Sequence, residues 1–372
     1  MPLLHKIAGV VIVCAVILGL VLPREERGDA PERAAARAGA QSEPRGESGG
    51  RKAADPARRQ ERPSAPPSPT TTVIAQARPE AARVRANELG QIPVLMYHRI
   101  VKKPEMSLDR SVQEFRDEME RLARTGYTPI TAGEFAAGWI NVPAGRYPVV
   151  LTFDDSTPGH FALDAGGNPA PDTAVAILME TARRHPGFRP TATFYLNKEL
   201  FQMGDRAAEG LKWLVRHGFE LGNHTLSHKN LAELSQSAVQ KEIGEIESQI
   251  TSLAGIHTTT LAYPFGVEPK KPAWAHAKDG SYQFKGVFLA GWRPSASPFS
   301  KDFDWRRIPR VRSEGKIAED DCKRYCSTAW LDWLDKNPGE RYISDGDPNT
   351  VSFPRAAERK LADRFRAYAR AY

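Results

Sequence analysis

The sequence Val149-Val150-Leu151-Thr152-Phe153-Asp154-Asp155 places two adjacent carboxylates directly after a run of apolar residues. A run that is apolar at consecutive positions is typical of a strand buried on both faces of a parallel sheet. Neighbouring side chains on a strand point to opposite sides. One carboxylate could therefore bind a metal ion while the other stays free as a base, although paired acids also occur as caps of a following helix.

Six more β-rich segments occur along the chain, and helical patterns alternate with them. The segments span residues 93–100, 191–197, 219–225, 258–266, 284–290 and 307–312. Capping-box pairs predict two helix starts, at Ser111 with Glu114 and at Thr131 with Glu134. A further helix is predicted by apolar residues at helical spacing: Val239, Ile243, Ile246, Ile250 and Leu253. Strand alternating with helix seven times predicts an α/β fold, an irregular (β/α)7 barrel with polar residues gathered at its catalytic rim.

A second cluster of polar residues is His224-Thr225-Leu226-Ser227-His228, which follows one of the predicted strands. The spacing of four puts both imidazoles on one face of a helix or turn, where they can share one divalent ion. A histidine pair at this spacing is also common on surfaces and in cores. Together with one carboxylate of the aspartate pair, the two rings make three protein ligands with an open position, as in a catalytic zinc site. Zinc is the default metal, and nickel or cobalt also suit these ligands.

These two motifs resemble those of the polysaccharide deacetylases with the NodB homology fold, carbohydrate esterase family 4. The resemblance runs from about residue 92 to residue 312. Thr152-Phe153-Asp154-Asp155 is similar to the first family motif, and the segment from His224 to His228 is similar to the second. The resemblance implies that Asp154 is the general base and that Asp155 binds the metal with the two histidines. It also implies hydrolysis of an acetamido group on an N-acetylated glycan.

The third family motif resembles Ala262-Tyr263-Pro264-Phe265-Gly266. By this resemblance the backbone N–H of Phe265 would help to form an oxyanion hole, and Tyr263, Pro264 and Phe265 would line the sugar groove. The family motif usually begins with an arginine that orients the base, whereas Ala262 stands here. Arg310, in Ile308-Pro309-Arg310, could supply that charge; the alternative is an arginine on the surface.

The family usually ends with a strand of the type Leu-x-His, whose histidine is the general acid, and no such strand follows residue 312. Val94-Leu95-Met96-Tyr97-His98 has that shape at the other end of the domain, as in a circularly permuted member. We therefore predict that His98 protonates the leaving amine; a buried structural histidine is the alternative. Asp304-Trp305 resembles the fourth motif, so Asp304 would orient His98 and raise its pKa.

The ends of the chain differ in composition from its centre. Residues 7–22 form an unbroken apolar run, and residues 1–22 are predicted to be a signal anchor or a signal peptide. Residues 23–89 are rich in Ala, Arg, Pro and Glu, and we expect a disordered linker. The barrel would span residues 90–328, and residues 329–372 would form a partly helical extension with a basic helix at 356–372. We therefore expect an exported protein anchored in the inner membrane and facing the periplasm or the exterior, or one secreted after cleavage.

The cysteines bear on an expected disulfide, and the net charge bears on the class of binding partner. In an exported protein, Cys322 and Cys326 are expected to form a local disulfide, with two buried thiols as the alternative. The net charge is +7, but the basic residues are dispersed, so no nucleic-acid partner is predicted. The alternatives to a deacetylase are an O-acetyl esterase or small-molecule amidase on the same site, and a catalytically silent glycan-binding module. The identity of the glycan and the oligomeric state stay open.

Overall fold

The structure, a computed structural model, describes residues 74–313 and 322–372. The apolar segment at 7–22 and the predicted linker up to residue 73 lie outside this part of the chain. Within the described residues, no helix has both the length and the apolar character that crossing a membrane requires.

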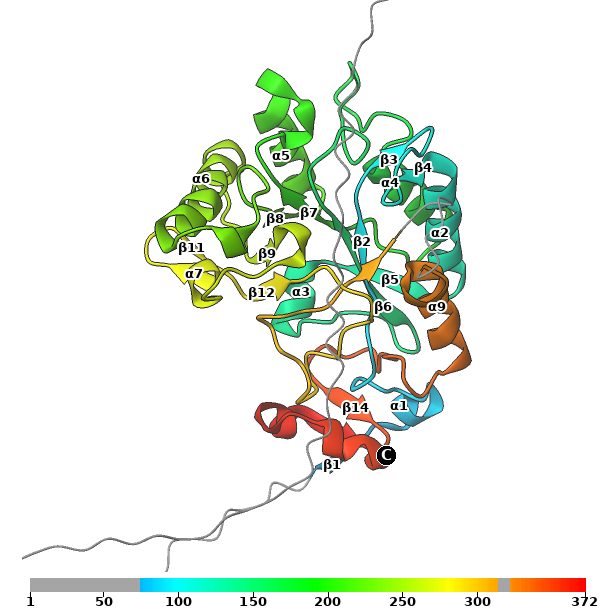
Figure 1. Cartoon of the computed structure of the whole chain (residues 1–372). Helices are drawn as coiled ribbons and strands as arrows, with labels where there is room; N and C mark the ends of the chain where they lie inside the picture. Colours follow the sequence, from blue (N-terminus) through cyan, green and yellow to red (C-terminus); the bar gives the residue numbers. More distant parts are fainter. Residues whose placement is uncertain (1–73, 314–321) are drawn as a thin grey trace, which may run out of the picture. The chain divides into compact units, whose positions relative to one another are not determined.

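A curled parallel sheet forms the centre of the molecule (Figure 1). Its main path has seven neighbouring strands: β12 (Gly286–Phe288), β9 (Thr260–Ala262), β8 (Glu220–Asn223), β7 (Thr193–Leu196), β6 (Tyr147–Phe153), β2 (Val94–Tyr97) and β13 (Val311–Arg312). Every predicted β-rich segment contains one of these strands. A single parallel bridge between Phe288 and Ile308 links β12 to the segment that leads into β13. The sheet is therefore a curled, barrel-like sheet whose two edges meet through that one bridge.

One strand of the central sheet was not predicted. β5 (Tyr127–Ile130) pairs with the first half of β6, from Tyr147 to Val150. It contains Pro129, which cannot donate a ladder hydrogen bond and usually argues against a strand. On this side of β6, β7 pairs only with Thr152 and Phe153. The first half of β6 is therefore open to pairing with β5.

Helices cover the outer face of the sheet (Figure 1). The longer ones are α2 (Val112–Arg124), α4 (Ala174–Arg184), α5 (Ala207–Arg216), α6 (Gln236–Ala254) and α9 (Ser327–Lys336). Both predicted capping boxes form, at the starts of α2 and of α3 (Ala132–Ala137). Each such cap stabilises its helix by about 1 kcal/mol. The predicted helix at residues 239–253 is α6, whose apolar stripe is buried against the sheet.

Short elements complete the fold. They are α1 (Pro79–Arg83), β3 (Ile100–Val101), β4 (Arg110–Ser111), α7 (Ala273–His276), β10 (Ala277–Lys278), β11 (Tyr282–Gln283) and α8 (Cys322–Tyr325). The structure joins Cys322 to Cys326 in a disulfide, as expected.

The two ends of the described chain form a second, three-stranded parallel sheet in the order β1 (Ala75–Gln76), β15 (Ala369–Ala371) and β14 (Val351–Phe353). The linker predicted to end at residue 89 is therefore too long, since folded structure already begins by residue 74. Ile74, Leu89 and three alanines of this segment are buried, and the carboxylate of Glu88 accepts hydrogen bonds from Tyr342, Asp345 and Ser352.

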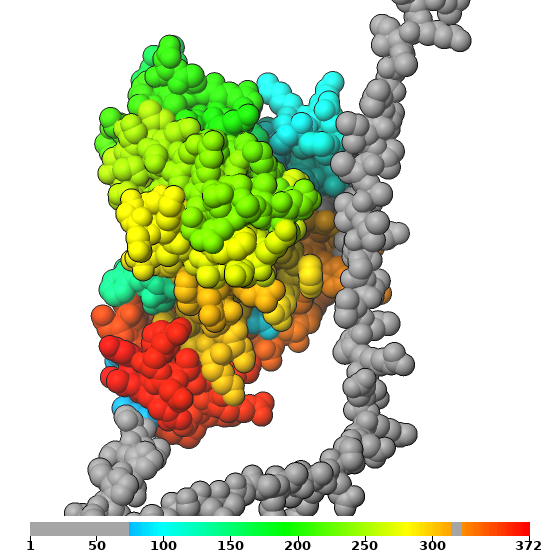
Figure 2. Space-filling model, turned by 60° about the vertical axis from the view of Figure 1, so that its left-hand side comes forward, coloured from blue at the N-terminus to red at the C-terminus, as the bar shows by residue number. Residues whose placement is uncertain are grey.

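The predicted basic helix at residues 356–372 is wrong. Two 3-10 segments, Arg355–Lys360 and Asp363–Tyr368, precede β15 instead. The reason is an alternating burial of Ala369 and Ala371, which fits a strand rather than a helix. In Figure 2 this terminal segment (red) packs against the gold connection after β12, where Ser300 pairs with Leu361. The predicted domain boundary at residue 328 also falls inside α9.

Candidate active site

The aspartate pair lies at the carboxyl end of β6, where the backbone changes direction. Asp155 lies two residues after Phe153, the last residue of β6, and adopts a left-handed conformation with φ of 75°. Asp154 therefore points into the interior and is buried, whereas Asp155 is half-buried at the rim. The sequence places two carboxylates side by side, and this turn puts them in different surroundings.

Arg310, from the segment before β13, holds Asp154 in a bidentate ion pair. Its Nη1 lies 2.7 Å from Oδ1 and its Nη2 lies 2.8 Å from Oδ2 of the carboxylate. The Nε–H of Arg310 donates to the Leu289 carbonyl at 2.8 Å, which fixes the guanidinium plane. Burial alone would raise the pKa of Asp154, but the charge and the hydrogen bonds of the Arg310 guanidinium outweigh it and hold that pKa well below its usual range. Asp154 is therefore an ionised, oriented carboxylate, and Arg310 is not a surface residue.

Asp155, His224 and His228 bring three donor atoms together. Oδ1 of Asp155 lies 3.5 Å from Nε2 of each histidine, and the three atoms all lie within 4.8 Å of one another. The Nδ1–H of His224 donates to the Ala262 carbonyl at 2.8 Å, so Nε2 is the nitrogen that can face a ligand. That Nε2 is buried and has no hydrogen-bond partner in the described part of the chain.

These three side chains fit a divalent metal ion. A buried imidazole nitrogen that carries a lone pair and no partner is costly unless a cation uses it, and a histidine ligand usually donates its other N–H to a carbonyl. Burial and the neighbouring His224 also lower the pKa of His228, which favours the neutral ring that metals bind.

The loop between β8 and α6 sets the histidine geometry. It is a turn rather than a helix, because Thr225 and His228 adopt left-handed conformations with φ of 64° and 52°. Glu242 of α6 accepts hydrogen bonds from the N–H and the hydroxyl of Ser227 and so fixes the turn between the two rings. Nothing in the spacing of the histidines indicated Glu242.

The three residues expected to line the sugar groove after β9 differ in exposure. Phe265 is 64% exposed, and its ring centre lies 4.6 Å from that of His228. No hydrogen bond among the described residues uses the Phe265 N–H, so it is free to donate to a ligand. Tyr263 and Pro264, by contrast, are buried and do not line an open groove. The ring of Tyr263 packs in the core cluster with Leu261 and Val287.

His98 follows β2 at the same rim. Its Nδ1 is buried and has no partner among the described residues. Burial lowers the pKa of His98, opposed by the charges of Asp154 and Asp155 and supported by those of Arg310 and His228. His98 therefore shares the electrostatic surroundings of the aspartate pair. Its pKa is lowered by burial, whereas Asp304 was expected to raise it.

Asp304 and Trp305 are not arranged as predicted. Oδ1 of Asp304 accepts hydrogen bonds from the backbone N–H of Arg306 and from its Nε, at 3.1 and 2.9 Å. Trp305 packs with its ring 5.5 Å from that of His276. A contact with a residue only two positions away satisfies the Asp304 carboxylate, so the prediction that it orients His98 is wrong.

His160 is a neighbour of the site that the motifs did not reveal. Its Nε2–H donates to the backbone carbonyl of His98. The ring is buried with its centre 5.1 Å from that of Phe153, and burial lowers its pKa to about 4. A neutral ring therefore supports the backbone of the predicted acid. Its only signal in the sequence is a lone histidine in a Pro-Gly-His turn after the aspartates.

Comparison with known proteins agrees with this arrangement. Residues 141–284 match the family model described as polysaccharide deacetylase. The chain is 24% identical, over 62% of its length, to 75% of a putative polysaccharide deacetylase, YxkH, of Bacillus subtilis. It is 25% identical, over 41% of its length, to about half (49%) of a peptidoglycan-N-acetylglucosamine deacetylase of Bacillus cereus.

A solved structure shares the fold. The Streptococcus pyogenes deacetylase PplD in complex with acetate superposes with a TM-score of 0.50 at 20% identity, covering 64% of this chain and 98% of that one. The segment that matches the family model, residues 141–284, contains the aspartate pair, His224 and His228. The segment that carries the site, residues 141–284, is thus similar to the polysaccharide deacetylases, a family of hydrolases.

Proposed function

We propose that this enzyme hydrolyses N-acetyl groups of an N-acetylated polysaccharide, such as a cell-wall glycan or an exopolysaccharide, and releases acetate. The observation that carries the proposal is that a candidate base and a candidate metal site lie side by side at the rim of the sheet. An ionised, arginine-held carboxylate, Asp154, lies beside three donors that fit one divalent ion: Asp155, His224 and His228. The named activity of the Bacillus cereus relative supports an N-acetylglucosamine polymer as the substrate.

The metal would be zinc by default, with nickel or cobalt as alternatives for this donor set. When bound, it would polarise the acetyl carbonyl and lower the pKa of water at the site. The protein's own groups would then complete the reaction.

Asp154 is the proposed general base. Water adds to the acetyl carbon, and the carboxylate takes one of its protons. Arg310 keeps this carboxylate ionised and fixes both of its oxygens. The free N–H of Phe265 would donate to the oxygen that gains negative charge, at the edge of the His228 ring.

His98 is the proposed general acid. The bond between the acetyl carbon and the sugar nitrogen breaks, and His98 gives a proton to that nitrogen, so acetate and a free amine leave. The lowered pKa of His98 means that the ring releases a proton readily but must first receive one. Asp154, which gains a proton in the preceding step and influences His98 electrostatically, is the proposed source.

The direct test is acetate release from N-acetylglucosamine oligomers and from O-acetylated xylan, with and without a chelator. Release from the oligomers that stops with the chelator and returns with zinc supports the proposal. Release from the xylan alone would assign the site to an O-acetyl esterase. No release from either by a protein that binds the oligomers and holds metal would indicate a silent binding module.

We also propose that the enzyme is exported and works next to a membrane. The apolar segment at residues 7–22 and the polar stretch that follows it support this proposal. Protease treatment of intact cells should degrade the enzyme only after the outer layers have been opened, and carbonate washing should leave it with the membranes. Recovery in the soluble cell interior would overturn the proposal.

A further inference from the structure

A cleft of about 670 Å³ opens on the connection between β12 and β13. This connection, residues 289–307, runs from the rim of the sheet to its opposite end, where Ser295 pairs with Ile92. The volume lies in the range of small-molecule and sugar sites. The walls near the rim include Ala290, Gly291 and Trp292.

The connection that lines this cleft passes next to the proposed catalytic groups. Gly266, next to Phe265, lies so close to the connection that a Cβ atom there would stand 2.6 Å from the backbone nitrogen of Ala290. A Cβ atom on Gly291 would stand 2.8 Å from the carbonyl oxygen of Arg310. The segment that carries Trp292 therefore touches the oxyanion loop on one side and the arginine that holds the base on the other. A polymer bound at Asp154 would enter this cleft with its neighbouring sugar units.

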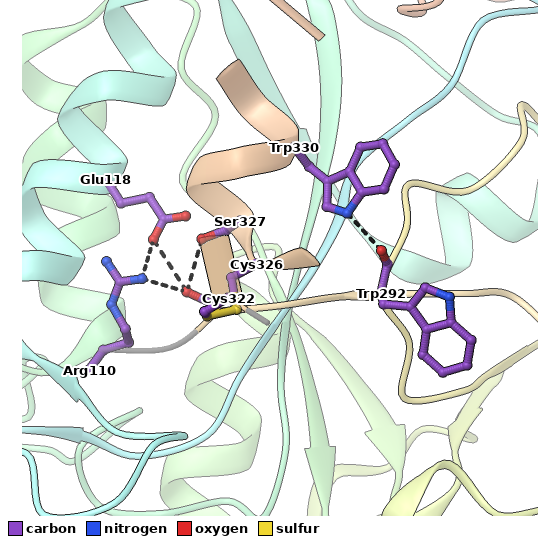
Figure 3. The surroundings of a disulfide bond; sticks show 8 residues. Arg110, Glu118, Trp292, Cys322, Cys326, Ser327 and Trp330 are labelled. Carbon is purple, nitrogen blue, oxygen red and sulfur yellow. Dashed lines mark hydrogen bonds and ion pairs between the residues drawn. A yellow bond between two sulfur atoms is a disulfide. The ribbon is translucent and has the colours of Figure 1, made fainter. Parts of the chain in front are cut away.

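The backbone of Trp292 is held in place, whereas its side chain is exposed to solvent. Its carbonyl accepts a hydrogen bond from the indole N–H of Trp330 at 2.7 Å, and it forms a bridge with Val311. Figure 3 shows Trp330 on α9 facing this carbonyl, while the ring of Trp292 turns away from it. The ring is 66% exposed. An exposed indole beside a cleft offers a large apolar face on which a ligand can pack.

The support behind Trp330 is rigid. Cys326 precedes the first residue of α9, forms the disulfide with Cys322 and pairs with Arg312 of β13 (Figure 3). The N-terminal end of α9 is thus fastened to the strand that follows Arg310. The position of Trp292 relative to the catalytic groups is fixed by the same strand.

We infer that Trp292 is a platform on which a second sugar unit of the glycan stacks, so that the enzyme prefers a chain of several N-acetylhexosamine units to a short fragment. This inference rests on the proposed function and adds the class of substrate that the site selects. The apolar face of a pyranose ring can cover an indole, and such an anchor typically contributes a tenfold or greater share of affinity. The polar groups farther along the cleft, including Asp302 and Arg307, would meet the sugar hydroxyls.

The test compares acetate release from the dimer and the pentamer of β-1,4-linked N-acetylglucosamine. Trp292→Ala should lower the ratio of kcat/KM for the pentamer over the dimer about tenfold, mostly through KM. Trp330→Phe, which removes only the N–H that holds Trp292, should lower the ratio by a smaller factor. The matched control is Trp139→Ala. Trp139 is 49% exposed but lies beside the amino end of β8, at Glu220, and should keep the wild-type ratio.

The outcomes separate the two claims. If wild type releases acetate from both oligomers but Trp292→Ala keeps the wild-type ratio, the platform is wrong and the deacetylase stands. If Trp139→Ala lowers the ratio and Trp292→Ala does not, the glycan follows a different surface. If wild type releases no acetate from either oligomer, the proposed function itself fails. Isothermal titration of the pentamer into an Asp154→Asn protein, with and without Trp292→Ala, gives a binding readout that does not depend on turnover; equal affinities there would also overturn the platform.

Discussion

Arg310 and Asp154 stand 156 positions apart in the sequence, yet both oxygens of the carboxylate accept hydrogen bonds from one guanidinium group. The two residues meet because β13 lies next to β2, which in turn lies next to β6. The base is thus held by the closing segment of the sheet, and not by the end of β9, where Ala262 stands in place of the arginine that the family motif usually has. The pairing is buried on both sides.

The first prediction concerns this ion pair. Arg310→Lys should keep a positive charge but lose the bidentate contact, and kcat should fall by about 10²-fold because the base is misplaced. Bound metal should stay at the wild-type ratio, since none of the three ligands contacts Arg310. In Arg310→Met, kcat should fall further, and the free energy of unfolding should drop by about 3 kcal/mol because Asp154 is left charged and unpaired in the interior. A lysine variant with wild-type kcat would contradict the role.

The second prediction concerns the metal. His224→Ala should purify with little bound metal and have no measurable turnover, because it removes the buried nitrogen that no other group uses. Elemental analysis of the purified protein gives the metal-to-protein ratio directly. As a matched control, His257→Ala changes an exposed histidine on the far side of α6 and should leave that ratio unchanged. Full metal content in His224→Ala would remove it from the ligand set.

The third prediction separates His98 from a structural histidine. His98→Ala should retain the metal and lower kcat for an acetanilide-type or sugar amide by about 10²–10⁴-fold, the usual contribution of a general acid. The loss should be smaller for a substrate whose leaving group needs no proton, such as an aryl acetate. His217→Ala, which changes an exposed histidine at the end of α5, is the control. Equal losses on both substrates would point to a structural role.

Much of the fold follows from local patterns. The strands were predictable because each is a short apolar run buried on both faces, and the starts of α2 and α3 because their capping residues lie at fixed spacing. β5 was not predictable, since Pro129 argues against a strand and only its position at the edge of β6 permits it.

The aspartates and histidines could be located from motifs, but the shape around them could not. The left-handed turn at Asp155 decides which carboxylate faces Arg310, and single-residue spacing carries no such information. Asp304 was misassigned because a motif cannot reveal that Arg306, two residues away, satisfies it. The N-terminal boundary was misplaced because most buried positions of residues 74–89 hold alanines or polar residues such as Glu88, and only Ile74 and Leu89 among them are large and apolar.

The fourth prediction concerns that boundary. A chain that begins at residue 90 should unfold at least about 5 °C below one that begins at residue 74, because it loses β1 and leaves the Tyr342 hydroxyl and the Ser352 N–H without the acceptors of Glu88. Glu88→Ala in the longer chain should show part of the same loss. Glu80→Ala, which removes only an exposed pair with Arg83, should not. Thermal unfolding followed by circular dichroism measures all four proteins, and equal midpoints for the two truncations would restore the linker up to residue 89.

The fifth prediction concerns Glu220, which lies half-buried at the start of β8. Burial raises the pKa of its carboxyl group, although hydrogen bonds from Gly133, Thr193 and two further threonines oppose the shift. The folded protein therefore keeps this proton at a pH where the unfolded chain has lost it. The stability that it contributes is complete below the ordinary glutamate pKa and is lost as the pH rises through the raised value. Glu220→Gln cannot ionise, so its free energy of unfolding should fall less than that of wild type between pH 4.5 and a neutral pH on the order of 7. Urea titrations at the two pH values give the comparison, with the exposed Glu199→Gln as the control. An equal pH dependence in Glu220→Gln and wild type would show that Glu220 is ionised in the fold, held as an anion by the threonine hydroxyls that surround it.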